Sequence, residues 1–338
     1  MKRREFLMSA AMAGSALGTA YAATAGQTAS APATEGSKGE MKYRVLGNTK
    51  EKVSLLGLGG YHIGVPETEG ESIKLIHAAL DGGINFLDNS WGYHRGESEV
   101  RMGKALAGGR RDKVFLMTKI DGQTKASATE QLDQCLQRLQ VDTIDLVQHH
   151  EVIRLEDPDC IFAEGGALEA LMEARQAGKL RYIGFTGHKD PLVHLRMLEV
   201  AQQHDFVFDA VQMPVNVLDA HFRSFGDKVL PELTRLGIGV LGMKSMAGGH
   251  ALRTNAVSPD ECLQYAMTLP TSVVISGMEN MDVLNKNLEV VRNFEPLSED
   301  QLAAILARTT SFAKSGKYEP FKTTRGYDAT AIHPEWLG

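Results

Sequence analysis

The chain has 338 residues, a formal net charge of −6 and 43% hydrophobic residues, which suits one large domain or two small ones with a substantial core. The charges are well mixed, with no basic stripe and no clustering of aromatic residues with Arg, and this argues against nucleic acid as a partner. The cysteines Cys135, Cys160 and Cys262 are odd in number and far apart, so a disulfide framework is not expected. No His or carboxylate cluster has metal-ligand spacing, and no metal is expected.

The N-terminal residues 1–25 have the layout of a signal peptide. A basic head that includes Arg3 and Arg4 precedes the Ala- and Gly-rich apolar segment Met8–Tyr21, and small residues that suit cleavage follow it. The adjacent arginines resemble the twin-arginine export signal. We therefore expect a bacterial protein in the periplasm or otherwise exported, with the twin-arginine export machinery as a partner. An uncleaved anchor or a chance pair of arginines is the alternative.

Residues 26–40 are rich in Thr, Ser, Ala, Gly and Pro and are expected to form a flexible leader. The apolar segment before them is too short and too Gly-rich to span a membrane, which takes about 20 strongly apolar residues. After cleavage, no stable membrane span is expected. The folded domain is predicted to occupy residues 41–338.

The pattern from Met41 is strand, turn, strand, with Gly47-Asn48 as a hairpin turn. Helix and strand signals then alternate as far as residue 295. Helical spacing is clear at Ile73, Ile76 and Leu80, before Asp81-Gly82-Gly83 ends the helix. The predicted strands are Val53–Leu58, Ile84–Leu87, Val114–Thr118, Ile144–Gln148, Tyr182–Thr186, Phe208–Gln212, Ile238–Met243 and Ser272–Ser276.

Eight strands separated by helical stretches predict an α/β fold, a closed (β/α)₈ TIM barrel with an N-terminal hairpin and a C-terminal tail. A doubly wound open sheet is the alternative. Such a sheet usually carries a G-x-G-x-x-G turn after an early strand, and the chain has none, nor does it have a P-loop.

Polar residues follow three consecutive strands at regular spacing. Asp88 follows the second strand, Lys119 the third and His150 the fourth, each 31 positions from the last, while Tyr93 stands five residues after Asp88. A strand, a helix and two loops take about 30 residues. Because active sites of TIM barrels form at the C-terminal ends of the strands, we expect these four side chains to meet there.

These residue types suit proton transfer to a carbonyl oxygen. The ammonium of Lys119 is expected to lower the pKa of the Tyr93 phenol from about 10, and Asp88 to hold Lys119 in place. Tyr93 would then protonate the oxygen as hydride reaches the carbon, with an imidazole orienting the substrate. Protein side chains supply no hydride, so a nicotinamide cofactor is implied. Since consecutive strand residues face opposite sides, only one of His149 and His150 faces the lumen.

Here the chain resembles the aldo/keto reductase family over residues 43–295. The family's D-x-x-x-x-Y stretch matches Asp88–Tyr93, and Gly96, Ser98 and Glu99 continue it. Lys119 matches the family lysine, and His150 stands five residues after Asp145, as the family histidine does. The resemblance implies a catalytic tetrad of Asp88, Tyr93, Lys119 and His150, a barrel that binds NADP or NAD without a Rossmann fold, and a small-molecule carbonyl substrate.

The resemblance also implies a set of cofactor-binding positions. Thr186-Gly187 stands where the family usually has Ser-Asn, and Met243 stands where it often has an aromatic residue. Val283 replaces the family Arg that pairs with the 2′-phosphate, so NADP and NAD both stay open. The implied cofactor-binding residues are Gly59, Gly60, Tyr61, Asp88, Thr186, Gly187, Gln212, Met243, Lys244, Gly277, Asn280 and Asn287.

Two functions follow as hypotheses. The first is an NAD(P)-dependent oxidoreductase that interconverts carbonyls and alcohols, with Trp336 or Tyr318 of the tail Gly316–Gly338 shaping the substrate pocket. The second is a nicotinamide- or ligand-binding barrel that acts as a sensor or binding protein with little turnover. The departures at Gly187, Met243 and Val283 motivate the second.

Overall fold

The computed structural model describes residues 31–338 of the chain. The predicted signal peptide at residues 1–25 lies outside these residues, as do positions 26–30 of the predicted leader. The rest of that leader is hydrogen-bonded to the domain: Glu35 forms an antiparallel bridge with Tyr43, and the Gly39 N–H donates to the Arg292 carbonyl over 3.1 Å. Residues 31–40 of the predicted leader therefore belong to the compact unit Ala31–Gly338.

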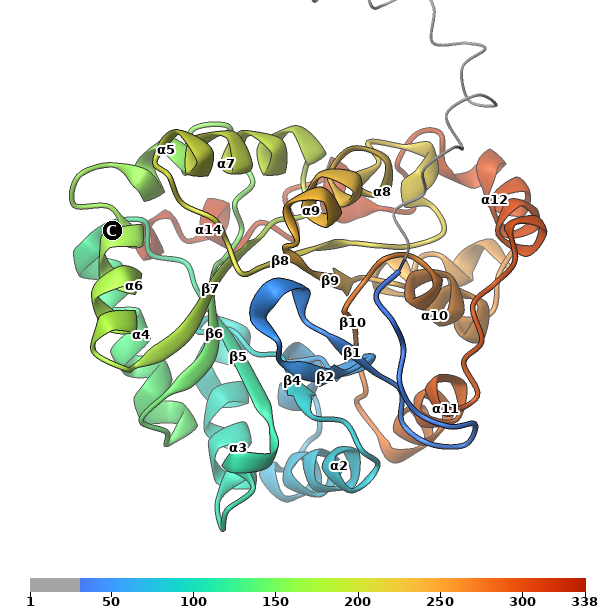
Figure 1. Cartoon of the computed structure of the whole chain (residues 1–338), viewed down its shortest axis with the longest axis horizontal. Coiled ribbons are helices and arrows are strands. Elements are labelled where there is room, and N and C mark those ends of the chain that lie inside the picture. The colour runs from blue at the N-terminus through green and yellow to red at the C-terminus, as the bar shows by residue number, and fades with distance from the viewer. Residues whose placement is uncertain (1–30) are drawn as a thin grey trace, which may run out of the picture. The chain divides into compact units, whose positions relative to one another are not determined.

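Within residues 31–338, eight parallel strands close into a barrel (Figure 1), so the predicted (β/α)₈ barrel is confirmed and the open sheet is wrong. Their order around the barrel is β10-β3-β4-β5-β6-β7-β8-β9. The strands are β3 (Leu56–Leu58), β4 (Phe86–Leu87), β5 (Phe115–Ile120), β6 (Ile144–His149), β7 (Leu180–Thr186), β8 (Ala210–Pro214), β9 (Gly239–Met243) and β10 (Val273–Ser276).

The predicted hairpin is present and covers the N-terminal end of the barrel. Strands β1 (Tyr43–Val45) and β2 (Lys52–Ser54) pair antiparallel around a turn at Gly47–Thr49, and this ribbon lies over the barrel centre in Figure 1. The apolar run Val53–Leu58, predicted as one strand, is divided between β2 and β3. It divides because Val53 packs at the base of the lumen while Leu56 packs against the surrounding helices.

Side chains along each strand point alternately into the lumen of the barrel and toward the surrounding helices, and this separates two apolar layers. The lumen is filled by side chains rather than open, with Phe86 stacked on Phe115 at 5.3 Å between ring centroids. The lumen cluster consists of Leu46, Val53, Phe86, Phe115, Met117, Leu146, Ala210, Leu241, Val273 and Ile275. Beyond this cluster, toward the C-terminal ends of the strands, the residues that face the lumen are polar. These polar residues form the candidate site.

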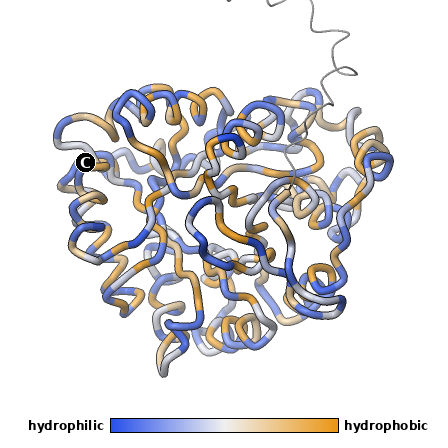
Figure 2. Tube along the Cα trace, in the orientation of Figure 1, coloured by the Kyte–Doolittle hydropathy of each residue, from blue (hydrophilic) through white to orange (hydrophobic). Residues whose placement is uncertain are grey.

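Helices surround the barrel (Figure 1) and alternate hydrophobic with hydrophilic residues along their length (Figure 2). Thr68 caps the N-terminus of α2 and Ser258 that of α10, each in a capping box. The helices that follow the barrel strands are α2 (Glu69–Asp81), α3 (Glu97–Leu106), α4 (Lys125–Leu139), α5 (Asp157–Phe162), α6 (Ala167–Gln176), α7 (Pro191–Gln203), α8 (Phe225–Lys228), α9 (Leu230–Leu236), α10 (Pro259–Thr268) and α11 (Met281–Arg292).

The C-terminal tail runs over the loops at the C-terminal ends of the strands. After α12 (Glu299–Ala313), it contains α13 (Pro320–Thr323) and α14 (Ala329–Ile332). The Glu151 carboxylate, in the loop after β6, accepts the first backbone N–H groups of α14 over 3.0 and 2.9 Å. Trp336 then packs edge-on against Trp91 after β4, at 5.2 Å between ring centroids. The tail therefore forms part of the mouth of the barrel.

Candidate active site

The residues predicted to carry the chemistry lie together at the C-terminal end of the barrel. Asp88 follows β4, Tyr93 begins a 3-10 turn at Tyr93–Gly96, Lys119 belongs to β5 and His150 follows β6. Because β4, β5 and β6 are neighbours in the barrel, these side chains rise from adjacent positions around the mouth.

Lys119 is the most buried of these groups, with 1% of its surface exposed. Its Nζ is ion-paired with Asp88 and donates to the Asn89 carbonyl over 2.6 Å. Burial lowers the pKa of Lys119 from its ordinary value, and the charge of Asp88 opposes this shift. The pair thus places a positive charge where water does not screen it.

Tyr93 lies beside this ammonium and is half-buried. Its Oη is 3.3 Å from Lys119 Nζ, which also lies 4.7 Å from the centre of the phenol ring. Burial, followed by the negative charges of Asp88 and Glu151, raises the pKa of Tyr93 well above 10.0. For the chain alone the pKa is thus raised and not lowered as the sequence analysis expected, because burial and these negative charges dominate. The phenol is therefore protonated at neutral pH.

The loop that carries Tyr93 is held by contacts on both sides. His94 and Arg95 adopt positive φ angles of 50° and 58°, a left-handed conformation that is costly for residues with a Cβ. The His94 ring nitrogen Nε2 lies 2.8 Å from the Tyr61 carbonyl oxygen, and the Ser98 hydroxyl donates to the Gly60 carbonyl over 2.6 Å. These bonds offset the strain and fix Tyr93 relative to the loop after β3.

His149 and His150 face opposite sides, as strand alternation requires. His149 packs under the helices with its ring centre 6.5 Å from that of Phe208, and burial lowers its pKa to about 3. His150 lies at the mouth, with its ring edge-on to Tyr93 at 5.9 Å between centroids. The structure therefore brings His150 to the other three residues and leaves His149 outside the site.

The predicted nicotinamide end of the cofactor site contains buried polar atoms without partners. Thr186 and Gln212 are in register on β7 and β8, and each is 2% exposed. Within residues 31–338, the Thr186 hydroxyl and the Gln212 carbonyl oxygen make no hydrogen bond. Buried polar groups are rarely left unpaired. A hydroxyl and an amide side by side fit a primary carboxamide, so this pair suits a nicotinamide.

The glycines of the predicted site allow backbone segments to approach closely. A Cβ on Gly60 would lie 2.2 Å from the Asp88 carbonyl oxygen, and one on Gly187 would lie 2.2 Å from the Val152 carbonyl oxygen. Gly277 is covered by the His62 ring, and the Gly59 N–H donates to the Ser276 carbonyl over 2.9 Å. These glycines pack the loops around the mouth, and Tyr61 stands above them, 53% exposed.

Met243 and Lys244 follow one another at the end of β9. Met243 is half-buried. Lys244 Nζ lies 5.4 Å from the ring centre of Phe321 and 5.5 Å from that of Tyr327, both in the tail. Burial lowers the pKa of Lys244 to about 8, against the opposing charge of Glu151. Lys244 is thus a cation below about pH 8, held by aromatic rings near the mouth.

The two asparagines predicted to bind the cofactor, at the N-terminus and in the middle of α11, both have structural partners. Asn280 caps the helix, because its side-chain oxygen accepts the Val283 N–H over 2.9 Å. Asn287 is buried and donates to the Ser276 hydroxyl over 3.2 Å. Val283 is half-buried in the first turn and follows the exposed acidic residue Asp282.

Asp121 and Gln148 reach the site although the sequence analysis missed them. Asp121 Oδ1 lies 2.9 Å from His150 Nδ1. Gln148 is fully buried in register with Lys119, and its amide has no hydrogen-bond partner within residues 31–338. The sequence carried a signal for both residues, because alternate residues of a strand face the same side. Asp121 lies two positions after Lys119, and Gln148 lies two positions before His150, so each pair shares a face.

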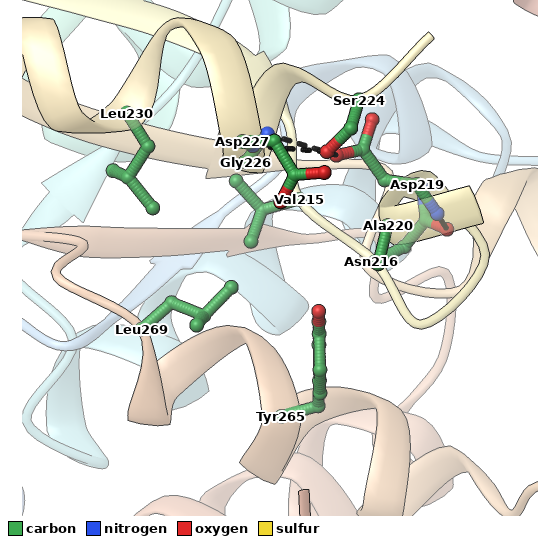
Figure 3. Close-up of a pocket in the computed structure, with 10 residues that line it drawn as sticks. All are labelled: Val215, Asn216, Asp219, Ala220, Ser224, Gly226, Asp227, Leu230, Tyr265 and Leu269. Atoms are coloured by element: carbon green, nitrogen blue, oxygen red, sulfur yellow. Dashed lines mark hydrogen bonds between the residues drawn. The ribbon is translucent and has the colours of Figure 1, made fainter. Parts of the chain in front are cut away.

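The two tail residues proposed for the substrate pocket are separated. Trp336 packs on Trp91 at the mouth, whereas Tyr318 packs on Phe312 at 6.0 Å between centroids, within an outer apolar cluster. A small cavity of about 80 Å³ lies between the loop after β8 and α10 and contains none of the predicted site residues. Figure 3 shows Asp219, Ser224 and the Tyr265 ring around it.

Within residues 31–338, no three His, Cys, Asp or Glu side chains are placed to hold a metal ion. In the same residues, no helix combines the length and apolar character needed to cross a membrane.

Comparison with known proteins places this geometry in a family. The model of the aldo/keto reductase family matches residues 55–262. The chain is 31% identical over 240 residues to the uncharacterized oxidoreductase YrpG of Bacillus subtilis, covering 64% of this chain and 71% of the relative. It is 27% identical over 305 residues to L-galactose dehydrogenase of Arabidopsis thaliana, covering 78% and 92% respectively.

A solved structure has the same fold. The holo form of an aldo-keto reductase from Bacillus halodurans superposes with a TM-score of 0.69 at 24% sequence identity, covering 84% of this chain and all of that one.

Proposed function

Because this chain belongs to the aldo/keto reductase family, whose members are NAD(P)-dependent oxidoreductases, we propose that it interconverts small-molecule carbonyls and alcohols with Tyr93 as the proton donor. One observation carries the assignment of roles. The Tyr93 hydroxyl lies 3.3 Å from Lys119 Nζ, and Lys119 is itself ion-paired with Asp88. Phenol, ammonium and carboxylate thus form one connected group at the mouth of the barrel.

In this proposal, Tyr93 supplies the proton and the other residues prepare it. The phenol is protonated at neutral pH, as a proton donor requires, and burial raises its pKa further above 10.0. Lys119 stabilises the phenolate left after transfer, and Asp88 keeps the ammonium aimed at it. His150 orients the substrate oxygen from the neighbouring strand. A bound nicotinamide would supply or accept the hydride.

The chain's own residues also suit the cofactor. Thr186 and Gln212 present an unpaired hydroxyl and carbonyl oxygen, which would hold the carboxamide. Lys244, a cation below about pH 8, would face the phosphates. Titrating the mature protein with NADPH and NADH, followed by a panel of carbonyl compounds, tests the proposal; no binding of either nucleotide would contradict it.

The choice between NADP and NAD depends in this proposal on the first turn of α11. We expect Val283→Arg to increase the affinity for NADPH relative to NADH by about 10-fold, because a guanidinium pairs with a 2′-phosphate in a bidentate manner. Dissociation constants from tryptophan fluorescence quenching measure the ratio. Val283→Met is the matched control, and an unchanged ratio in the arginine variant would show that this turn does not approach the phosphate.

We further propose that residues 1–25 direct the protein out of the cytoplasm through the twin-arginine machinery. This proposal depends on the sequence alone, chiefly on Arg3 and Arg4. Replacing both arginines by lysine should leave the protein in the cytoplasm of a bacterial host, whereas the parent chain should appear in the periplasm. Fractionation followed by immunoblotting measures this, and equal export of both chains would exclude a twin-arginine signal.

A further inference from the structure

One buried carboxylate at the mouth has no role in the proposed reaction. Asp121 follows β5 directly and is 2% exposed. Its Oδ1 lies 2.9 Å from His150 Nδ1, and within residues 31–338 this is the only hydrogen bond of its side chain. The second carboxylate oxygen, Oδ2, is buried without a partner. An unpaired buried oxygen costs free energy, so packing alone gives no reason for an acid at this position.

The backbone around Asp121 is fixed by the helix that follows. The side-chain oxygen of Gln131 on α4 accepts the N–H groups of Asp121 and Gly122, each over 2.8 Å. The Gln131 amide nitrogen donates to the Trp336 carbonyl over 2.9 Å. The backbone of Asp121 is therefore anchored by Gln131, which the C-terminal tail contacts in turn, and this fixes the point from which the carboxylate reaches His150.

We propose that Asp121 is a positioning residue that holds the Nδ1–H of His150 and so directs its Nε2 toward the mouth of the barrel. As a statement about the reaction, this rests on the proposed function. A carboxylate accepts but does not donate, so the proton between these atoms belongs to Nδ1. Ser90 is the second neighbour of Nδ1, with its hydroxyl oxygen at 3.3 Å.

The contact with Asp121 determines which hydrogen bonds His150 can form in carbonyl reduction and in alcohol oxidation. Nε2 has no hydrogen-bond partner within residues 31–338 and is left for a substrate. Without a proton, Nε2 accepts from an alcohol hydroxyl, as oxidation requires. To donate to a carbonyl oxygen, Nε2 needs a second proton on the ring. Tyr93 packs edge-on against the ring, and Asp88 and Glu151 are charged groups that act on Tyr93.

The tautomer of His150 is the test that does not depend on activity. ¹⁵N spectra of histidine-labelled protein at about pH 9, where free imidazole is neutral, distinguish protonated from bare ring nitrogens. His150→Gln identifies the signals. We expect the Nδ1–H form in the parent protein, a shift toward the Nε2–H form in Asp121→Ala, and retention of Nδ1–H in Asp121→Asn, whose amide oxygen still accepts. Asp133→Ala, on the exposed face of α4, should change nothing.

Kinetics provide the second readout. Asp121→Ala should lower kcat for alcohol oxidation about 10- to 100-fold, a typical loss for a residue that orients a histidine, with KM for the cofactor unchanged and partial recovery in Asp121→Asn. An unchanged tautomer in Asp121→Ala would overturn the proposal. A shifted tautomer in a protein that reduces no carbonyl would support the positioning role and reject the proposed function instead.

Discussion

Tyr93→Phe should lower kcat/KM for the reduction of a generic aldehyde by about 10²- to 10⁴-fold, the contribution of a general acid. The variant keeps the ring and removes only the hydroxyl that lies 3.3 Å from Lys119 Nζ. The affinity for the cofactor should stay unchanged, because this hydroxyl lies with the catalytic residues and not with Thr186 and Gln212. Steady-state rates and a fluorescence titration measure the two quantities on one preparation.

Tyr182→Phe is the matched control for this experiment. Tyr182 lies near the opposite end of the lumen, where its hydroxyl donates to Glu51 over 3.0 Å, and we expect its rate to match that of the parent protein. Retained turnover in Tyr93→Phe would contradict the assigned role. If the parent protein binds the nucleotide but reduces no carbonyl, the binding-protein hypothesis takes precedence.

The direction in which the pKa of Tyr93 is shifted predicts how the rates of reduction and oxidation depend on pH. Burial raises the pKa of Tyr93 well above 10.0, so the protonated phenol predominates at neutral pH and the phenolate is scarce. Reduction uses the phenol, so ionisation of Tyr93 should not lower the rate of reduction between about pH 7 and 9. Alcohol oxidation uses the phenolate, so its kcat/KM should rise about tenfold per pH unit over that range. Parallel pH profiles in both directions would show this divergence.

Lys322→Met should destabilise the fold by about 3–5 kcal/mol, the cost of breaking a buried ion pair by removing one partner. Lys322 is 1% exposed, and its Nζ donates to Asp219 over 2.7 Å, to the Phe222 carbonyl over 2.8 Å and to Glu319 over 3.0 Å. Methionine fills the space but leaves two buried carboxylates without a cation. Urea unfolding followed by circular dichroism at about pH 8 measures the loss.

The same variant has a predicted pH dependence. Burial raises the pKa of Glu319 to about 7, with the charge of Asp219 adding to the shift. A carboxyl whose pKa is raised in the folded state contributes stability below its unfolded pKa and loses it as pH rises through the folded value. The destabilisation in Lys322→Met should therefore be smaller near pH 5 than near pH 8.

Lys179→Met is the control for this stability measurement. Lys179 pairs with Asp133 on the surface, with side chains 44% and 54% exposed, and exposed pairs contribute little. We expect its unfolding midpoint to stay close to that of the parent protein. Equal losses in both lysine variants would show that the buried cluster does not stabilise the attachment of the tail.

The architecture could be predicted from the sequence because the spacing of apolar residues decides which face of each helix or strand is buried. The alternating strand and helix signals predicted the closed barrel, and the spacing of Asp88, Lys119 and His150 placed them at the ends of neighbouring strands. The error at Val53–Leu58 was local too: a continuous apolar run does not reveal that one half lines the lumen base while the other packs against helices.

The tertiary structure alone decided the environment of those side chains. The raised pKa of Tyr93 results from burial and from carboxylates on three different loops, which are remote from one another in sequence. The contact between Asp121 and His150 joins the ends of the neighbouring strands β5 and β6, and the hydrogen bonds from the tail to Glu151 join positions more than 170 residues apart. Burial and charge act through space, so they are fixed only when the chain has folded.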